Sequence, residues 1–169
     1  DGKLMTKEKI AFQGEKGAYS HIATNELFSN AEIKTCATFE ETFKCAFDDD
    51  KYKIVIPLEN SLAGRVADIH YLLPKYKLQI YGEHFQKVEH NLLAKSDAEF
   101  EDIKSVRSHA QAIGQCQNII NKYKFKTIIS ADTAGSAKEL AEGSDKTIAA
   151  IASELSASIY NLKIIKKNI

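Results

Sequence analysis

The stretch that decides the fold class is SVRSHAQAIGQCQNIINKYKFKTIISA, residues 105–131. Ser105-Val106-Arg107 predicts a short strand, and residues 127–131 predict a second one. The apolar residues between them are spaced by three and four positions: Ile113, Cys116, Ile120 and Tyr123. This spacing predicts a helix over residues 110–123 with one dry face. The order strand, helix, strand is a βαβ unit, so the segment predicts an α/β fold on a largely parallel sheet.

The same alternation extends along most of the chain. Further strands are predicted at residues 9–12, 32–35, 53–57, 78–84, 85–95, 147–152 and 163–169. Further helices are predicted at residues 20–28, 39–47, 61–73, 133–143 and 153–160. Thr38 and Glu41 form a capping box, Phe39, Phe43 and Phe47 form a buried stripe, and Pro74 is expected to end its helix.

The composition excludes several classes of protein. The 169 residues carry 23 Lys+Arg and 23 Asp+Glu, and this zero net charge argues against nucleic acid as a partner. The apolar runs are far shorter than the ~18 residues that a membrane span needs, so we expect no membrane insertion. Three cysteines at no metal-ligand spacing indicate reduced thiols and a cytoplasmic location. Residues 1–4 precede Met5, and we expect them to be a cloning remnant.

Polar residues and glycines gather in four turns that would each connect a strand to the next helix. These turns are residues 14–20, 59–64, 108–111 and 132–135. In an open α/β sheet such turns lie at one edge, where helix N-termini favour an anion, so a small carboxylate ligand fits. The alternative is that Ser61, Ser108 and Thr133 only cap helices, and that the glycines only permit tight turns.

Other kinds of site find little support. Gly14-x-x-Gly17 lacks the full dinucleotide fingerprint, and no Gly-Lys-Ser/Thr phosphate loop occurs. The five histidines are not at zinc-binding spacing, so we expect no metal. Glu59 is a candidate acid or base if burial raises its pKa, with Asn60 holding a substrate oxygen. Alternatively, Glu59 only complements the dipole of the following helix.

Eight motifs occur in a recognisable order. They are FQGEKGAYS (12–20), IPLENS (56–61) with Gly64 and Val66, His90 before Leu92-Leu93, SHAQA (108–112), Gln115-Cys116, Thr133-Ala134, AAIAS (149–153) and YNL (160–162). Together they resemble the catalytic domain of prephenate dehydratase, and the resemblance runs from Lys9 to Ile169. It implies a two-lobed α/β fold similar to type II periplasmic binding proteins, with the active site in the cleft between the lobes. Lobe 1 would be residues 9–82 plus 159–169, and lobe 2 residues 83–158.

The resemblance also implies a carbon–oxygen lyase of phenylalanine biosynthesis. The family converts prephenate to phenylpyruvate, carbon dioxide and water without a cofactor, and the resemblance implies a homodimer. The implied catalytic residues are Glu59, Asn60, Ser61 and Gln111. The implied substrate-binding residues are Gly17, Ser20, Gly64, Ser108, His109, Thr133 and Ala134.

Two departures from the family pattern concern the site. Ala110 stands where the family has proline. This change relaxes the first turn of the helix, but the Gln111 amide is retained. The family's Thr-Arg-Phe motif and regulatory ACT domain would follow Ile169, so we expect a catalytic domain truncated before them. The sequence leaves open whether this chain is active without the Thr-Arg-Phe motif. Arogenate dehydratase, a non-catalytic carboxylate-binding clamp of the same fold and a plain α/β domain remain alternatives.

Overall fold

The structure is a computed structural model that describes residues 7–169, so the prediction for residues 1–4 lies outside the described residues. The contacts divide the chain into two compact units. The first contains the described residues up to Gly14 together with Ser20–Gln86, and the second contains Glu15–Tyr19 and Lys87–Ile169. The short turn Glu15–Tyr19 is therefore flanked by the first unit in sequence but belongs to the second by contact.

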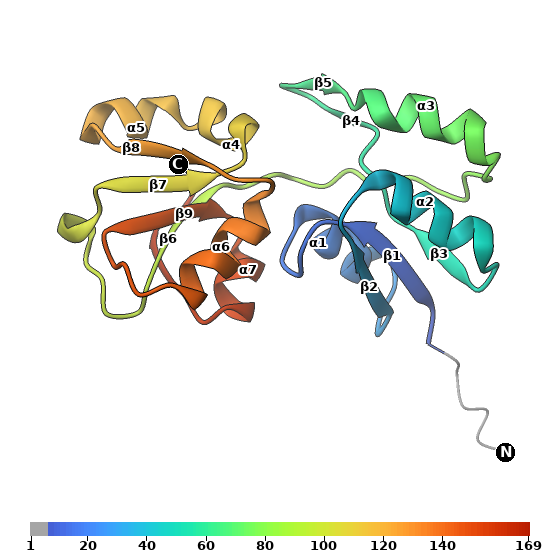
Figure 1. The fold of residues 1–169 in the computed structure, drawn as a ribbon, viewed down its shortest axis with the longest axis horizontal. Coiled ribbons are helices and arrows are strands. Elements are labelled where there is room, and N and C mark those ends of the chain that lie inside the picture. The colour runs from blue at the N-terminus through green and yellow to red at the C-terminus, as the bar shows by residue number, and fades with distance from the viewer. Residues whose placement is uncertain (1–6) are drawn as a thin grey trace, which may run out of the picture. The chain divides into compact units, whose positions relative to one another are not determined.

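The first unit is built on a three-stranded parallel sheet in the order β2-β1-β3. Its strands are β1 (Lys9–Gln13), β2 (Glu32–Cys36) and β3 (Tyr52–Ile54). Helices α1 (Tyr19–Leu27) and α2 (Phe39–Asp48) make the two connections between them (Figure 1). Ile10, Ala11 and Phe12 in the central strand are fully buried, as expected for a strand covered on both faces.

Helices α2 and α3 (Ala67–Tyr76) form the apolar cluster of this unit. The predicted capping box is confirmed in one half, because Thr38 accepts a hydrogen bond from the Glu41 N–H, whereas the Glu41 carboxylate accepts the Ala37 N–H in place of the Thr38 N–H. The predicted buried stripe is wrong at one end: Phe43 is fully buried, but Phe47 is 62% exposed and touches only the rim of the cluster at Tyr76. Pro74 lies inside α3 and does not end it: its missing N–H removes one helical hydrogen bond, and the helix continues to Tyr76.

Residues 59–90 depart most from the predicted elements. A hairpin of β4 (Glu59–Asn60) and β5 (Gly64–Arg65) precedes α3, where the sequence predicted a helix directly after residue 61. The strand predicted at residues 78–84 is absent, and of residues 85–95 only β6 (Asn91–Ala94) is a strand. The alternating pattern at residues 78–84 has no neighbouring strand to pair with, and Ile80, Tyr81 and Phe85 are exposed.

The second unit is built on a five-stranded mixed sheet in the order β10-β6-β9-β7-β8. Besides β6 its strands are β7 (Ser105–Ser108), β8 (Lys126–Ile129), β9 (Ile148–Ala152) and β10 (Lys163–Lys166), and a 3-10 turn, η1 (Phe100–Asp102), precedes β7. Strand β7 runs parallel to β8 and β9, whereas β6 is antiparallel to β9 and β10. The largely parallel sheet predicted from the sequence is thus confirmed for β7, β8 and β9.

Helices cover both faces of this sheet (Figure 1). Leu92 and Ile151 pack in one cluster with α4 (Ala110–Gln115) and α5 (Gln117–Tyr123). The cluster on the other face contains residues one position along the same strands, Leu93 and Ala150, with α6 (Thr133–Glu142) and α7 (Glu154–Ile159). This is the two-residue period of a strand buried on both faces. The single helix predicted at residues 110–123 is interrupted at Cys116, whose ψ of 20° lies outside the helical range.

The C-terminal strand lies in the second unit. Strand β10 pairs with β6, and the Ile169 N–H donates to the carbonyl of His90. The sequence-based division had placed residues 159–169 with the first lobe, so the contacts correct that boundary. Among residues 7–169 no helix is both long and apolar enough to cross a lipid bilayer.

The three cysteines are all free, and their different burial predicts different rates of alkylation. Burial raises the pKa of Cys116 to about 11 and also raises the pKa of Cys36. At pH 8 only about one Cys116 side chain in a thousand is then a thiolate. We expect iodoacetamide to modify the half-buried Cys45 first and Cys116 last, as followed by peptide mass spectrometry. Equal rates at Cys45 and Cys116 would contradict this burial.

Candidate functional site

Two helices of the second unit begin at the same edge of its sheet. Strands β7 and β8 are parallel neighbours that end side by side, with Ser108 opposite Ile129. The Ser130 N–H donates to the Ser108 carbonyl at 2.9 Å, which holds the two turns together. Helix α4 follows β7, and α6 follows β8. Their N-termini, with unpaired N–H groups and the positive ends of their dipoles, therefore lie at one edge.

The first turn of α4 presents two polar side chains. The half-buried His109 caps this helix, and its Nδ1 accepts the Gln111 N–H at 3.1 Å. Because Nδ1 is an acceptor, the proton of the neutral ring is on Nε2, which is then a donor. The Gln111 side chain is exposed and makes no hydrogen bond within the described part of the chain. Both residues can therefore donate to a ligand at this edge.

The first turn of α6 offers backbone donors. The Asp132 carboxylate caps the helix by accepting the Gly135 N–H, and burial raises the pKa of that carboxyl group. The first internal hydrogen bond runs from the Ser136 N–H to the Asp132 carbonyl, so the N–H groups of Thr133 and Ala134 have no helical acceptor. Ala134 is fully buried, backbone included, so of these two N–H groups only that of the half-buried Thr133 lies on a residue that a ligand can reach. These groups suit a carboxylate.

Ser108 has a structural role in the sheet. It is fully buried, and its hydroxyl donates to the Ile151 carbonyl at 2.7 Å, which joins β7 to β9. Its predicted contact with substrate stays a prediction.

The turn Glu15–Tyr19 is held against α6 and α7. The Gly17 carbonyl accepts hydrogen bonds from Ser153 at 2.6 Å and Ser156 at 3.0 Å. The Tyr160 hydroxyl donates to the Lys16 carbonyl at 2.6 Å, and Glu15 pairs with Lys138 at 3.3 Å. Gly17 is therefore a buried packing position, and its predicted contact with substrate stays a prediction.

Gly17→Ala is expected to destabilise the protein by about 2–4 kcal/mol. A Cβ atom would lie 2.4 Å from Ser156 Oγ and 2.9 Å from Ser156 Cα, and the φ of +98° is unfavourable for alanine. Urea denaturation measures the change. Gly114→Ala is the matched control, because nothing lies within 4 Å of a Cβ there and alanine favours the α4 helix. Equal stability of the two variants would contradict the close packing at Gly17.

The predicted residues of the hairpin are arranged by its tight turn. The Asn60 Oδ1 accepts the N–H groups of Leu62 at 2.9 Å and Ala63 at 3.1 Å, and Gly64 has a φ of +80°. The Asn60 carboxamide oxygen thus already accepts two hydrogen bonds, which leaves the Asn60 NH2 group as a donor. Glu59 and Ser61 are exposed. The burial proposed for Glu59 is therefore absent, and so is the helix expected directly after it.

The structure sorts the predicted residues into two sets. The set in the second unit is Gly17, Ser108, His109, Gln111, Thr133 and Ala134. The set in the first unit is Ser20, Glu59, Asn60, Ser61 and Gly64. Ser20 is half-buried in α1, and its carbonyl accepts the Thr24 hydroxyl at 2.7 Å. The contribution of the first-unit set to a reaction stays a prediction from the resemblance.

Three residues without a predicted role form a hydrogen-bonded chain in the second unit. They are Tyr19, His90 and Gln115. All three lie in the motifs quoted above, and this was the only sequence signal for a role, since their spacing along the chain does not show that their side chains are hydrogen-bonded. Burial raises the pKa of Tyr19, so its hydroxyl stays protonated at neutral pH.

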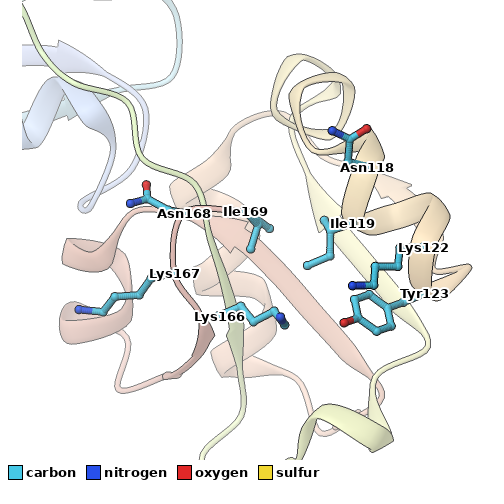
Figure 2. A pocket seen from close by; sticks show the side chains of 8 residues that line it. All are labelled: Asn118, Ile119, Lys122, Tyr123, Lys166, Lys167, Asn168 and Ile169. Carbon is cyan, nitrogen blue, oxygen red and sulfur yellow. The ribbon is translucent and has the colours of Figure 1, made fainter.

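A surface pocket of the second unit lies apart from these residues. Figure 2 shows it between α5 and the residues 166–169, with a volume of about 270 Å³. Lys122 and Lys166 both place their ammonium groups over the Tyr123 ring, at 5.3 and 5.9 Å from its centroid. None of the predicted site residues lines this pocket.

Comparison with known proteins agrees with the resemblance. The sequence model of the prephenate dehydratase family matches residues 10–169. The bifunctional N-acyl-homoserine lactone acylase/prephenate dehydratase of Komagataeibacter europaeus is 39% identical over 95% of this chain and 57% of its own length. Arogenate dehydratase/prephenate dehydratase 2 of Arabidopsis thaliana is 37% identical over 97% of this chain and 43% of its own length.

A solved structure supports the fold. The prephenate dehydratase of Staphylococcus aureus is 28% identical and aligns with a TM-score of 0.80 over 95% of this chain and 60% of its own. The expected fold class, a two-lobed α/β fold of the type II periplasmic-binding-protein kind, is thereby confirmed. The chain spans about half the length of the curated relatives it matches. From Ile10 to Ile169, this chain belongs to the prephenate dehydratase family.

Proposed function

We propose that this chain catalyses the decarboxylating dehydration of prephenate to phenylpyruvate, as a carbon–oxygen lyase of phenylalanine biosynthesis. The observation that carries the proposal is the edge of β7 and β8, where both α4 and α6 begin. Hydrogen-bond donors of this kind, in a member of this family, suit a small dicarboxylate.

The reaction needs no group beyond the substrate and one proton. The bond between the ring and its carboxylate breaks and releases carbon dioxide, and its electron pair enters the ring. The ring hydroxyl leaves with the added proton as water, so the prephenate dianion and one proton give the phenylpyruvate anion, carbon dioxide and water. Aromatisation drives the reaction, and the protein has only to orient the substrate and assist departure of the hydroxyl.

The residues at this edge divide those tasks. The N–H group of the half-buried Thr133 is placed to hold a carboxylate, with support from the α6 dipole. The Gln111 carboxamide donates to a substrate oxygen. The His109 Nε2–H is a candidate hydrogen-bond donor to the departing hydroxyl, because Nδ1 is occupied by the Gln111 N–H.

The test is to mix the protein with prephenate and follow phenylpyruvate by its absorbance, with a parallel sample on arogenate analysed for phenylalanine. Phenylpyruvate formation supports the proposal. Phenylalanine formed from arogenate alone would replace it with the arogenate reaction. Thermal stabilisation by prephenate without product would replace it with a non-catalytic clamp. The absence of both turnover and thermal stabilisation would overturn the proposal.

The resemblance also supports a homodimer, and the three free cysteines support a cytoplasmic location. Each chain has a mass of 18.8 kDa, so light scattering after size-exclusion chromatography distinguishes a dimer from a monomer directly. A monomeric mass at micromolar concentration would contradict the dimer without affecting the proposed reaction.

A further inference from the structure

One side-chain network joins three separate segments of the second unit. The Tyr19 hydroxyl lies 2.8 Å from the Glu89 carbonyl and 2.9 Å from His90 Nδ1. On the other side of the ring, His90 Nε2 lies 2.7 Å from Gln115 Oε1. His90 is 8% exposed, and the Tyr19 ring meets its ring edge to face at 5.7 Å. A buried imidazole with a partner on each nitrogen is held in one orientation.

The donors and acceptors fix the direction of this chain. Gln115 Oε1 can only accept, so His90 Nε2 carries the proton of the neutral ring. His90 Nδ1 is then an acceptor, and the single Tyr19 proton is shared between Nδ1 and the Glu89 carbonyl. Removal of the Tyr19 hydroxyl therefore leaves His90 Nδ1 without a donor, whereas the Glu89 carbonyl keeps the Asn91 side-chain NH2 as a donor at 3.2 Å.

The ends of the chain lie next to residues of the proposed site. Gln115 is the last residue of the six-residue helix α4, and Gln111 lies four positions earlier on the same helix face. Tyr19 ends the turn that contains Gly17 and directly precedes Ser20. His90 directly precedes β6, and its carbonyl accepts the Ile169 N–H at 3.0 Å. The network thus ties the orientation of α4 to the position of the Glu15–Tyr19 turn.

We infer that Tyr19, His90 and Gln115 are positioning residues that set the placement of Gln111 on α4 relative to the Glu15–Tyr19 turn. The kinetic consequence rests on the proposed function, whereas the structural coupling does not. A six-residue helix is too short to be stable by itself, so a hydrogen bond at its last residue can affect the position of its first turn.

The test variant is Tyr19→Phe, which removes one hydroxyl and keeps the ring that packs on His90. Tyr123→Phe is the matched control in the same unit, because the Tyr123 hydroxyl makes no hydrogen bond to any residue the structure describes. Two-dimensional NMR of uniformly 15N-labelled protein reads the network without substrate. We expect Tyr19→Phe to shift the His90 ring nitrogens and the backbone and side-chain amides of Gln111, and Tyr123→Phe to leave them unchanged. Unchanged Gln111 amides in Tyr19→Phe would overturn the inference, whatever the protein catalyses.

Kinetics at a temperature where both variants are fully folded by circular dichroism add the second readout. We expect kcat for prephenate to fall by about tenfold in Tyr19→Phe with a smaller change in KM, because a misplaced group costs most in the transition state. A purely structural role would leave kcat per folded molecule unchanged and would overturn the kinetic part. Should the wild-type protein not act on prephenate at all, the proposed function fails while the NMR result still decides the coupling.

The other end of the network allows a rescue experiment. Gln115→Met keeps the length of the side chain but removes the acceptor for His90 Nε2, and Gln115→Glu keeps an acceptor there. We expect Gln115→Met to reproduce the Tyr19→Phe shifts at Gln111 and Gln115→Glu to restore the wild-type signals. Identical spectra for the two Gln115 variants would contradict a hydrogen-bonded chain through His90.

Discussion

Gln111→Ala is expected to lower turnover of prephenate by roughly 100-fold, the loss typical of removing one hydrogen-bond donor that acts in a transition state. The Gln111 side chain is exposed and makes no hydrogen bond among residues 7–169, so it contributes little to folding. We therefore expect the free energy of unfolding to change by no more than about 0.5 kcal/mol. The measurement is kcat/KM from the phenylpyruvate assay, paired with urea denaturation.

Gln117→Ala is the matched control for this substitution. Gln117 begins α5 in the same unit, and its side chain donates to the Ile113 carbonyl at 3.2 Å, away from the edge of β7 and β8. We expect this variant to keep wild-type turnover and to lose a little stability. Turnover within twofold of wild type in Gln111→Ala would remove this residue from the site.

Phe43→Ala is expected to cost about 3–5 kcal/mol of stability, the range for truncating a fully buried phenylalanine. Phe43 is completely buried between Ile69 and Leu72, with its ring 5.9 Å from that of Tyr76. Phe47→Ala tests the same change one helical turn later on α2, where the side chain is 62% exposed. We expect it to cost less than about 1 kcal/mol. Equal losses in the two variants, measured by urea denaturation, would contradict the observed burial.

The sequence predicted those elements whose signals are local. The cap predicted at Thr38 accepts the Glu41 N–H, because capping depends on residues within one turn. The apolar run at residues 147–152 is β9, a central strand buried on both faces. Such runs need no knowledge of distant residues to be recognised.

The errors occurred where pairing partners decide the structure. The alternating residues 78–84 have no neighbouring strand, whereas β10 finds an edge position beside β6. The hairpin at residues 59–65 depends on the Asn60 side chain closing its turn, which the motif letters do not reveal. Strand pairing is non-local, so patterns read along the chain cannot supply it.

The candidate site shows the same division. The resemblance implied Gln111 as a catalytic residue and His109 and Thr133 as substrate-binding residues, and the structure brings the turns that carry all three to one edge of the sheet. It could not show that Ser108 is buried and donates to the Ile151 carbonyl of the neighbouring strand β9, or that Ala134 is buried. The burial of a turn residue depends on segments distant in sequence that pack against the turn, so it cannot be predicted from the residues of the turn alone.

The most direct test of the account is a titration of the 15N-labelled protein with prephenate, followed by its amide signals. We predict saturable shifts at Gln111, Thr133 and Ala134, which lie in the first turns of α4 and α6. Shifts absent from these amides, or confined to Lys122, Tyr123 and Lys166 around the surface pocket, would contradict it.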